Sequence, residues 1–263
     1  MKQRLIVGLT GLAILLPVLI WGGAGAVSVL VALALIVCLD EYARMAAPDH
    51  RALALSVLIP AGLGVHLVWT FAPDLAAPAM AVATMVCLTV PMFGVANVDD
   101  AARVAVRLGF GVMYAPLMLV PLVWLRREPD GLALLFLVLV VTWLGDTGAY
   151  FAGRFAGKTP LFLRVSPKKT REGAVGGTLL SVVGACAVKA IGGVDIGWAP
   201  LIGLAVVLDL AGVIGDLAES LLKRAWGVKD SGWIMPGHGG LLDRVDALLF
   251  TAPLLWAYVH MTR

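Results

Sequence analysis

Long apolar runs separated by short polar stretches dominate the chain. A helix needs roughly 20 apolar residues to cross about 30 Å of hydrocarbon, and nine runs approach that length. Short alternating segments typical of membrane β-barrel strands are not visible. The pattern predicts an all-α polytopic integral membrane protein with about nine transmembrane helices, at 5–21, 24–39, 52–71, 76–95, 104–125, 132–151, 174–191, 196–222 and 241–260.

The composition excludes the class of soluble globular proteins. Of 263 residues, 60% are hydrophobic and only 14% are charged, and the mean hydropathy is +0.95. Soluble domains carry about 25% charged residues, so this chain has too few charges to cover a water-exposed surface. The apolar runs are therefore predicted to face lipid.

The 20 basic residues are unevenly distributed between the two faces that nine spans would create. Because lysine and arginine favour cytoplasmic loops, the face with the majority is predicted to be cytoplasmic, and the N-terminus lies on it. The alternative that the first run is a signal peptide stays open, since Lys2 and Arg4 precede it. Sixteen basic residues share the N-terminal face, and the other four are Arg126, Arg127, Lys189 and Arg263.

The first half of the chain carries its charges at predicted span ends, which is typical of solvated interfacial groups. We therefore predict an N-terminal transmembrane region of about four spans (1–100), and a second transmembrane region (101–263) with cytoplasmic loops 152–173 and 223–240. The charges interpreted as interfacial are Asp40, Glu41, Arg44, Asp99, Asp100, Arg103 and Arg107.

The sixth predicted span and the loop after it carry polar residues of another kind. Asp146 lies in or at the end of the span, and an aspartate at a helix centre costs about 2.5–3.5 kcal/mol on insertion scales. In the loop, glycines and hydroxyls alternate with lysines, which suits polyphosphate binding. The alternative for the loop is that its basic residues only reflect the positive-inside bias of cytoplasmic loops. The alternative for Asp146 is a purely structural role.

The eighth predicted span has a polar stripe. At about 100° per residue, Asp209, Asp216, Glu219, Ser220 and Lys223 fall on one face about 100° wide. Such groups turn to a bundle interior or a water-filled cavity. One interpretation is a helix-packing contact in which Lys223 neutralises an acid. A single lysine does not account for three acids, however. Carboxylates are ligands of Mg²⁺, so we favour a cation site.

The connector to the ninth span contains small residues around one histidine, His238, within the run from Pro236 to Gly240. Glycines let backbone approach a ligand closely. Asp243 and Asp246 follow at a spacing that makes them neighbours on a helix. Zinc chemistry is not expected, because the other histidines are scattered and cysteines are distant.

Three segments between residues 142 and 250 contain closely spaced polar and glycine residues. Asp146, Thr147, Ala149, Tyr150, Gly153 and Arg154 make the first, and Ser166, Pro167, Lys169, Thr170, Glu172 and Gly173 the second. The third comprises Ser220, Lys223, Arg224, Lys229, Asp230, Gly232, Pro236, Gly237, His238, Gly239, Gly240, Asp243, Arg244 and Asp246. These three segments resemble the phosphatidate cytidylyltransferase (CDP-diacylglycerol synthase) family. The first hundred residues resemble it only in hydropathy, so residues 101–263 are predicted to form the catalytic region.

The resemblance implies that CTP (or dCTP) and phosphatidic acid give CDP-diacylglycerol and pyrophosphate, with Mg²⁺ and room for a second cation. The metal ligands would be Asp216 and Asp243, then Asp146 and Asp246. Phosphates would be neutralised by Lys223, Arg224, Lys229, His238 and Arg244. Nucleotide or lipid phosphate would also be bound by Asp146, Thr147, Ser166, Lys168, Lys169, Thr170, Ser220, Asp230, Gly239 and Gly240.

The expected setting is the bacterial cytoplasmic (inner) membrane, with the site facing the cytoplasm and no nucleic-acid partner; a homodimer is left open. Polyprenol or phytol kinases and archaeal ether-lipid cytidylyltransferases are the nearest alternatives. The kinases would lack the run from Pro236 to Asp246. A transporter is disfavoured because no inverted repeat of broken spans is evident. The motif of CDP-alcohol phosphotransferases is absent.

Overall fold

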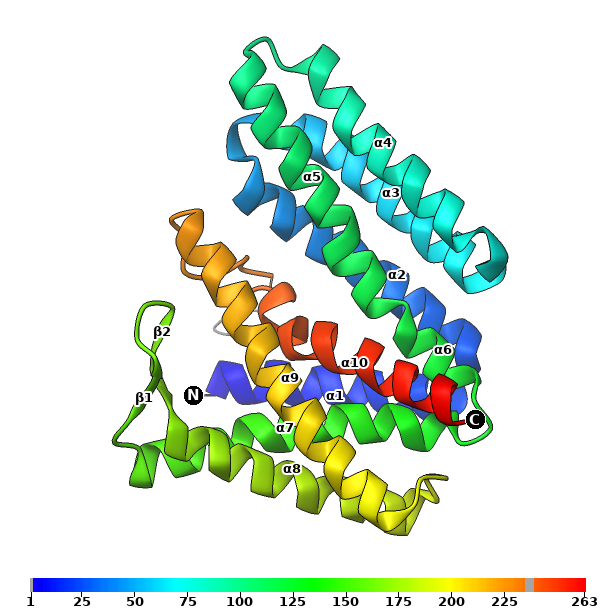
Figure 1. Cartoon of the computed structure of the whole chain (residues 1–263), viewed down its shortest axis with the longest axis vertical. Coiled ribbons are helices and arrows are strands. Elements are labelled where there is room, and N and C mark those ends of the chain that lie inside the picture. The colour runs from blue at the N-terminus through cyan, green and yellow to red at the C-terminus, as the bar shows by residue number, and fades with distance from the viewer. Residues whose placement is uncertain (1, 235–238) are drawn as a thin grey trace. The chain divides into compact units, whose positions relative to one another are not determined.

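The computed structural model describes the backbone of residues 2–234 and 239–263, and side chains from residue 10 onward within these ranges. The chain is mostly helical (Figure 1). The α-helices are α1 (Lys2–Trp21), α2 (Gly23–Ala46), α3 (Arg51–Phe71), α4 (Ala76–Gly94), α5 (Val98–Leu119), α6 (Pro121–Arg127), α7 (Gly131–Ala156), α8 (Arg171–Gly192), α9 (Trp198–Ala225) and α10 (Leu242–Thr262). Short 3-10 helices cover Pro48–His50 and Pro73–Leu75.

The all-α polytopic class is confirmed. Within the described residues, eight segments are long and apolar enough to cross a membrane, and α1 adds a shorter apolar stretch over Thr10–Trp21. The predicted fifth span corresponds to α5 and α6 together, as the segment Val98–Arg127. The helix is interrupted before Pro121, whose missing N–H cannot continue the hydrogen-bond ladder.

The chain forms two compact units. The first unit comprises Met1–Val123 and Trp226–Arg244, and the second comprises Trp124–Ala225 and Val245–Arg263. The segment between α9 and α10 therefore belongs with the N-terminal helices, although it follows the second unit's α9 in the sequence.

In the first unit, α2 packs against α3 and α5, and α3 packs against α4 and α5. Apolar side chains such as Leu39, Leu58 and Leu108 are fully buried there. Helix association in lipid depends on close van der Waals packing. Gly111 illustrates this, because a Cβ at this position would lie 2.5 Å from the ring of Tyr42.

In the second unit, α7 and α8 lie side by side along most of their length (Figure 1). Small residues make this approach possible. A Cβ on Gly148 would lie 2.5 Å from the Gly176 carbonyl oxygen, and a Cβ on Gly177 would lie 2.8 Å from that of Gly145. Both helices are therefore held at backbone-to-backbone contact, which places α7 residues next to the start of α8.

The segment predicted as cytoplasmic loop 152–173 contains an antiparallel hairpin. Its strands are β1 (Pro160–Phe162) and β2 (Ser166–Thr170), and β2 leads directly into α8. The Thr170 hydroxyl caps α8 by accepting a hydrogen bond from the Gly173 N–H at 3.1 Å. The Glu172 carboxylate accepts hydrogen bonds from the backbone N–H groups of Lys158 and Thr159, each at 3.1 Å. The hairpin is thus anchored at its base to the first turn of α8.

Candidate functional site

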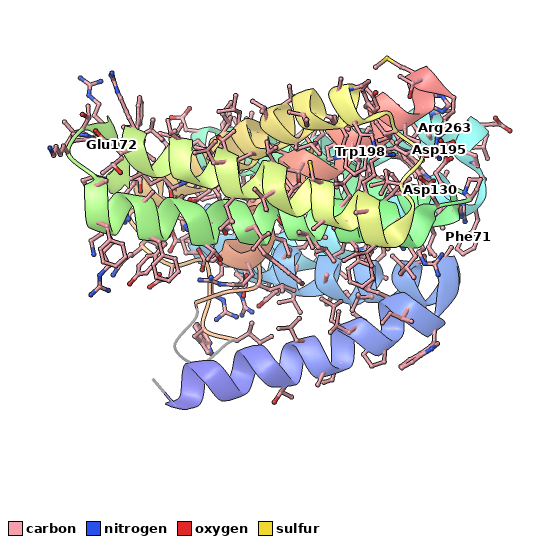
Figure 2. The ribbon with its side chains drawn as sticks, turned by 90° about the horizontal axis from the view of Figure 1, so that it is seen from below. Phe71, Asp130, Glu172, Asp195, Trp198 and Arg263 are labelled. Atoms are coloured by element: carbon pink, nitrogen blue, oxygen red, sulfur yellow. The ribbon has the colours of Figure 1, made fainter. Side chains whose placement is uncertain are left out.

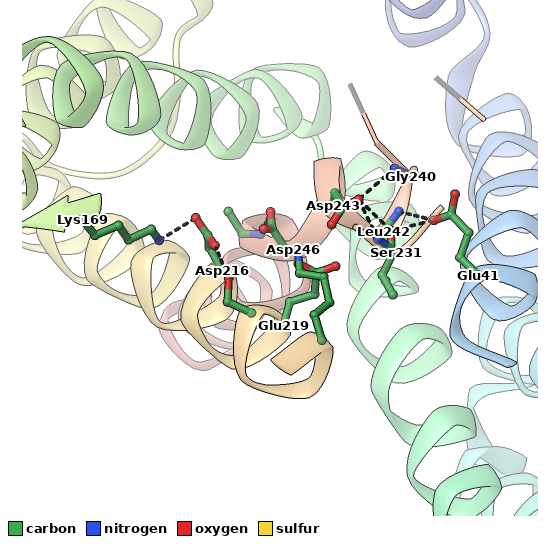
Figure 3. A network of polar contacts seen from close by, with 12 residues as sticks. Glu41, Lys169, Asp216, Glu219, Ser231, Gly240, Leu242, Asp243 and Asp246 are labelled. Atoms are coloured by element: carbon green, nitrogen blue, oxygen red, sulfur yellow. Dashed lines mark hydrogen bonds and ion pairs between the residues drawn. The ribbon is translucent and has the colours of Figure 1, made fainter. Parts of the chain in front are cut away.

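An ion pair joins the hairpin to the polar stripe of α9. Lys169 on β2 places its Nζ 2.5 Å from Oδ2 of Asp216 (Figure 3). The Ser220 hydroxyl, one turn further along α9, donates to the other oxygen of Asp216 at 3.3 Å. The structure therefore brings together three residues that the sequence analysis assigned to metal and phosphate binding.

Glu219 and Lys223 form a second ion pair, one turn apart on α9. The Glu219 side chain is 0% exposed and Lys223 is buried as well. Removing one partner of a buried ion pair is strongly destabilising because it leaves the other charge uncompensated. This pair matches the packing contact that the sequence analysis weighed as the alternative for the stripe.

Asp209, nearer the start of α9, is bound by hydroxyls. Its two carboxylate oxygens accept hydrogen bonds from Thr178 and Ser181 of α8, each at 2.7 Å. A Cβ on Gly145 would lie 2.3 Å from Oδ1 of Asp209. Asp209 is buried, and a buried carboxylate requires such donors. It faces the bundle interior, as the stripe predicted, and links α9 to α7 and α8.

Asp246 of α10 lies within electrostatic range of Asp216 and Asp146, whose negative charges repel its own, while Lys223 partly compensates. Its Oδ1 accepts a hydrogen bond from the Ala247 N–H at 2.7 Å. Acids from α7, α9 and α10 of the second unit are therefore gathered into one electrostatic cluster.

The donor set of this cluster fits Mg²⁺ in its chemistry. Within the described ranges, no three His, Cys, Asp or Glu side chains form a ready-made metal cage. Mg²⁺, however, is usually held by one or two carboxylates, with water and substrate phosphates completing its shell. The ammonium of Lys169 already lies against Asp216, so a cation is accommodated at this carboxylate.

In the first unit, Asp243 ties together the segment that leads to α10. Its Oδ2 accepts hydrogen bonds from the Ser231 N–H at 3.0 Å, the Ser231 hydroxyl at 2.9 Å and the Gly240 N–H at 2.8 Å (Figure 3). Gly239 has φ +82°, and a Cβ there would lie 2.6 Å from the same oxygen. The glycines permit this close approach, as expected. Pro236, Gly237 and His238 lie outside the described residues.

Glu41 corrects one interpretation made from the sequence. The predicted solvated interfacial charge is in fact buried, with only 3% of the residue exposed. Its carboxylate accepts hydrogen bonds from the N–H groups of Leu241 at 2.9 Å and Leu242 at 2.8 Å, and its Oε2 lies 3.2 Å from the Ser231 hydroxyl that it shares with Asp243. The local sequence shows only a pair of acids, Asp40 and Glu41, directly after a long apolar run, and this pattern does not distinguish a solvated acid from a buried one.

A model of the cytidylyltransferase family matches residues 2–262. The chain belongs to this family. A phosphatidate cytidylyltransferase of Staphylococcus haemolyticus is 33% identical over 263 residues, covering 97% of each chain. One of Brucella suis is 43% identical over 149 residues, covering 56% of this chain and 55% of the relative. One of Bacillus subtilis is 44% identical over 126 residues, covering 48% and 47% respectively. As a family member the protein is a nucleotidyltransferase, and its resemblance to the family is confirmed.

The remaining predicted site residues of this cytidylyltransferase are distributed as follows. The Thr147 hydroxyl donates to the Trp143 carbonyl at 2.7 Å, so it is used within α7. Ser166 and Lys168 lie on β2. Arg224 lies in the last turn of α9, Lys229 and Asp230 follow that helix, and Arg244 lies in the first turn of α10; all four are exposed. The predicted pairing of Asp216 with Asp243 joins residues of different units and stays a prediction.

Proposed function

We propose that this chain transfers the CMP group of CTP to phosphatidic acid, giving CDP-diacylglycerol and pyrophosphate. Full-length similarity to a relative named phosphatidate cytidylyltransferase supports the choice of substrates. The observation that carries the chemistry is the cluster of Asp146, Asp216 and Asp246 with Lys169 against it. An otherwise apolar helical unit that concentrates acids and a lysine at one place suits a metal-bound polyphosphate.

The reaction needs charge neutralisation more than a strong base. A phosphate monoester is largely ionised near neutral pH, so the lipid phosphate oxygen can attack the α-phosphorus of CTP directly. A bond forms between that oxygen and the α-phosphorus, and the bond from the α-phosphorus to the oxygen bridging to the β-phosphate breaks. Bound Mg²⁺ would stabilise the charge that develops on the phosphates.

The chain's own residues then have distinct tasks in the proposed reaction. Asp216, Asp146 and Asp246 would hold the metal, and Asp243 remains a candidate ligand from its place in the family motif. Lys169, on the hairpin, would exchange its ion pair with Asp216 for a contact with a substrate phosphate. The ion pair partly neutralises the acids before substrate binds, and its exchange then places the Lys169 cation at the phosphate.

The proposed location is the bacterial cytoplasmic membrane with the site open to the cytoplasm. The excess of basic residues on the N-terminal face supports this orientation. CTP is a cytoplasmic nucleotide, and phosphatidic acid carries its phosphate at the membrane interface. The two substrates therefore meet at that interface, with dCTP as an alternative nucleotide.

Two radiolabels test the proposal against the kinase alternative. Detergent-purified protein is incubated with phosphatidic acid, Mg²⁺ and CTP labelled at either the α- or the γ-phosphate. Cytidylyl transfer moves only the α-label into the lipid fraction, whereas a kinase moves only the γ-label, in a parallel incubation that supplies a polyprenol or phytol as the acceptor. Omitting phosphatidic acid is the control and should abolish lipid labelling. Absence of α-label from the lipid under every condition would refute the proposed function.

A further inference from the structure

The C-terminal end of α2 contacts the segment that links α9 to α10, although nothing in the sequence of α2 indicated a role in the reaction. Glu41 binds Ser231, Leu241 and Leu242. The ring of Tyr42 packs edge-to-face on Trp226, with centroids 5.4 Å apart. The guanidinium of Arg44 lies 3.8 Å from the ring centroid of Trp233. All these residues belong to the first unit, so α2 forms the support of this segment.

Within that support, Glu41 binds the beginning of α10. The first N–H groups of a helix lack partners inside the helix, and negative charge near them is stabilising. One Glu41 oxygen accepts from the Leu241 N–H and the other from the Leu242 N–H (Figure 3). The carboxylate comes from a residue about 200 positions away in the chain, so it fixes where α10 starts.

The segment is shaped to fit this carboxylate. A Cβ on Gly232 would lie 2.4 Å from one Glu41 oxygen, and a Cβ on Gly240 would lie 2.4 Å from the other. Real Cβ atoms do not approach this closely, so the two glycines leave the space that Glu41 occupies. Both glycines belong to the family motif identified from the sequence.

Ser231 connects Glu41 to Asp243. Its hydroxyl lies 3.2 Å from Oε2 of Glu41 and 2.9 Å from Oδ2 of Asp243. The Ser231 N–H and the Gly240 N–H also donate to that Asp243 oxygen. Glu41 and Asp243 therefore bind both described ends of the segment around residues 235–238, and Ser231 is shared between them.

We propose that Glu41 is a positioning residue for cytidylyl transfer, acting through Ser231 and the start of α10 on Asp243 and Gly240. The inference rests on the proposed function, because Asp243 and Gly240 are assigned to the substrates and metal through it. Groups that orient such residues typically change metal affinity or activity about 10- to 100-fold when altered.

The test compares Glu41→Gln and Glu41→Ala with wild type in the CTP and phosphatidic acid assay. We expect kcat/KM for CTP to fall about 10- to 100-fold in Glu41→Ala and less in Glu41→Gln, which keeps one acceptor oxygen. The Mg²⁺ concentration that gives half the maximal rate should rise. A purely structural role would reduce the amount of active protein and leave that concentration unchanged. Asp100→Asn, in the same unit and half-exposed beside Arg103, is the matched control.

Hydrogen exchange supplies a readout that does not depend on activity. The amides of Leu241 and Leu242 should exchange faster in Glu41→Ala than in wild type or Asp100→Asn. Ser231→Ala should lower activity as well. The double variant with Glu41→Gln should lose less activity than the product of the two single losses, because both residues act through one network.

The two hypotheses fail in different ways. If wild type labels no lipid, the proposed function is wrong, whatever Glu41 does to exchange. If wild type is active and folded Glu41→Ala retains wild-type kcat/KM and Mg²⁺ dependence, Glu41 is not a positioning residue. Unchanged exchange at Leu241 and Leu242 would contradict the contact itself. Thermal unfolding in detergent establishes that each variant is folded.

Discussion

The two ends of the second unit use their charges differently. Near the start of α7, Arg263 binds Asp130 at 2.7 and 2.8 Å and Glu128 at 3.2 Å, and Asp130 also accepts from the Asp195 N–H at 2.9 Å. At the opposite end, Glu172 anchors the hairpin that carries Lys169 to Asp216. Figure 2 shows Glu172 at one end of this unit and Asp130, Asp195 and Arg263 at the other.

The difference lies in the balance of charge. At the Asp130 end, a bidentate arginine ties the C-terminus of the chain to the start of α7, so the charges hold the fold together. At the hairpin end, Asp216 and Asp146 repel Asp246, and Lys169 on β2 reaches Asp216. Repelling carboxylates beside a cation on a hairpin are suited to binding and releasing charged ligands, whereas closed ion pairs are suited to stability.

The largest expected effect is that of Asp216→Asn. This change keeps the shape of the side chain but removes the charge that binds Lys169 and, in our proposal, Mg²⁺. We expect the turnover of folded protein to fall about 100-fold or more, as for other groups that stabilise developing charge. The measurement is the lipid-labelling rate across a Mg²⁺ titration. Near-normal Mg²⁺-dependent turnover would show that Asp216 is not a metal ligand. The two ends of the unit would then not differ in function as proposed.

Asp209→Ala tests the part of the α9 stripe that the structure assigns to packing. The substitution removes the hydrogen bonds that Thr178 and Ser181 donate to the carboxylate, after which each hydroxyl keeps only a backbone acceptor, Ala174 at 3.1 Å and Val141 at 2.8 Å respectively. Hydrogen bonds to charged groups contribute about 1.5–3 kcal/mol. We expect a lower unfolding temperature in detergent, with the turnover of the folded fraction close to that of wild type. Loss of turnover as large as in Asp216→Asn, without loss of stability, would instead make the whole stripe functional.

Lys169→Ala tests the hairpin cation. Lys169 is half-buried and contacts Asp216, whereas its neighbour Lys168 is exposed. A hydrogen bond to a charged group contributes about 1.5–3 kcal/mol, so we expect the Lys169 change to lower kcat/KM for CTP about tenfold or more. Lys168→Ala should have the smaller effect. Equal effects would mean that the hairpin contributes only overall positive charge.

The smallest expected effect is that of Asp130→Asn at the other end. Burial acts to raise the pKa of Asp130, but hydrogen bonds from Arg263 and the Asp195 N–H, with the Arg263 charge, lower it below the ordinary value of 3.8. A carboxyl whose folded pKa is depressed stabilises the folded state above the unfolded-state pKa, and this contribution is lost as the pH falls through the folded value.

Asp130→Asn should therefore reduce the free energy of unfolding by about 0.5–1 kcal/mol at neutral pH. The difference from wild type should shrink as the pH falls below 3.8, and turnover at neutral pH should be kept. The measurement is thermal unfolding of wild type and Asp130→Asn across this pH range. Asp99→Asn, at an exposed position, is the control. A difference that persists unchanged at low pH would show that the ion pair is not its source.

Much of the fold could be read from the chain, because the helices are long and lipid selects for continuous apolar runs. Each predicted run corresponds to a helix, with α5 and α6 together making the fifth. The polar face of α9 was also predicted, since 3.6-residue periodicity fixes which side chains share a face. The hairpin was not predicted, because strands this short leave little signal in a loop rich in charge.

The different partners of the acids along α9 could not be predicted from periodicity. Asp209 and Asp216 share a face, but Asp209 meets two hydroxyls of α8 and Asp216 meets a lysine of β2. Which partner each acid meets depends on the packing of α8 and on the path of the hairpin. Helical phase gives the direction of a side chain, not the chemistry of the group opposite it.

Local sequence thus specified the membrane class, the helices and the motif residues, because these depend on hydropathy, periodicity and spacing along the chain. Burial of Glu41 depended on residues about 200 positions away, whose N–H groups replace the water that an acid at a helix end would otherwise keep. Only the folded chain brings these N–H groups to the Glu41 carboxylate in place of water. It thereby turned a residue that resembled an interfacial charge into the support of the segment before α10.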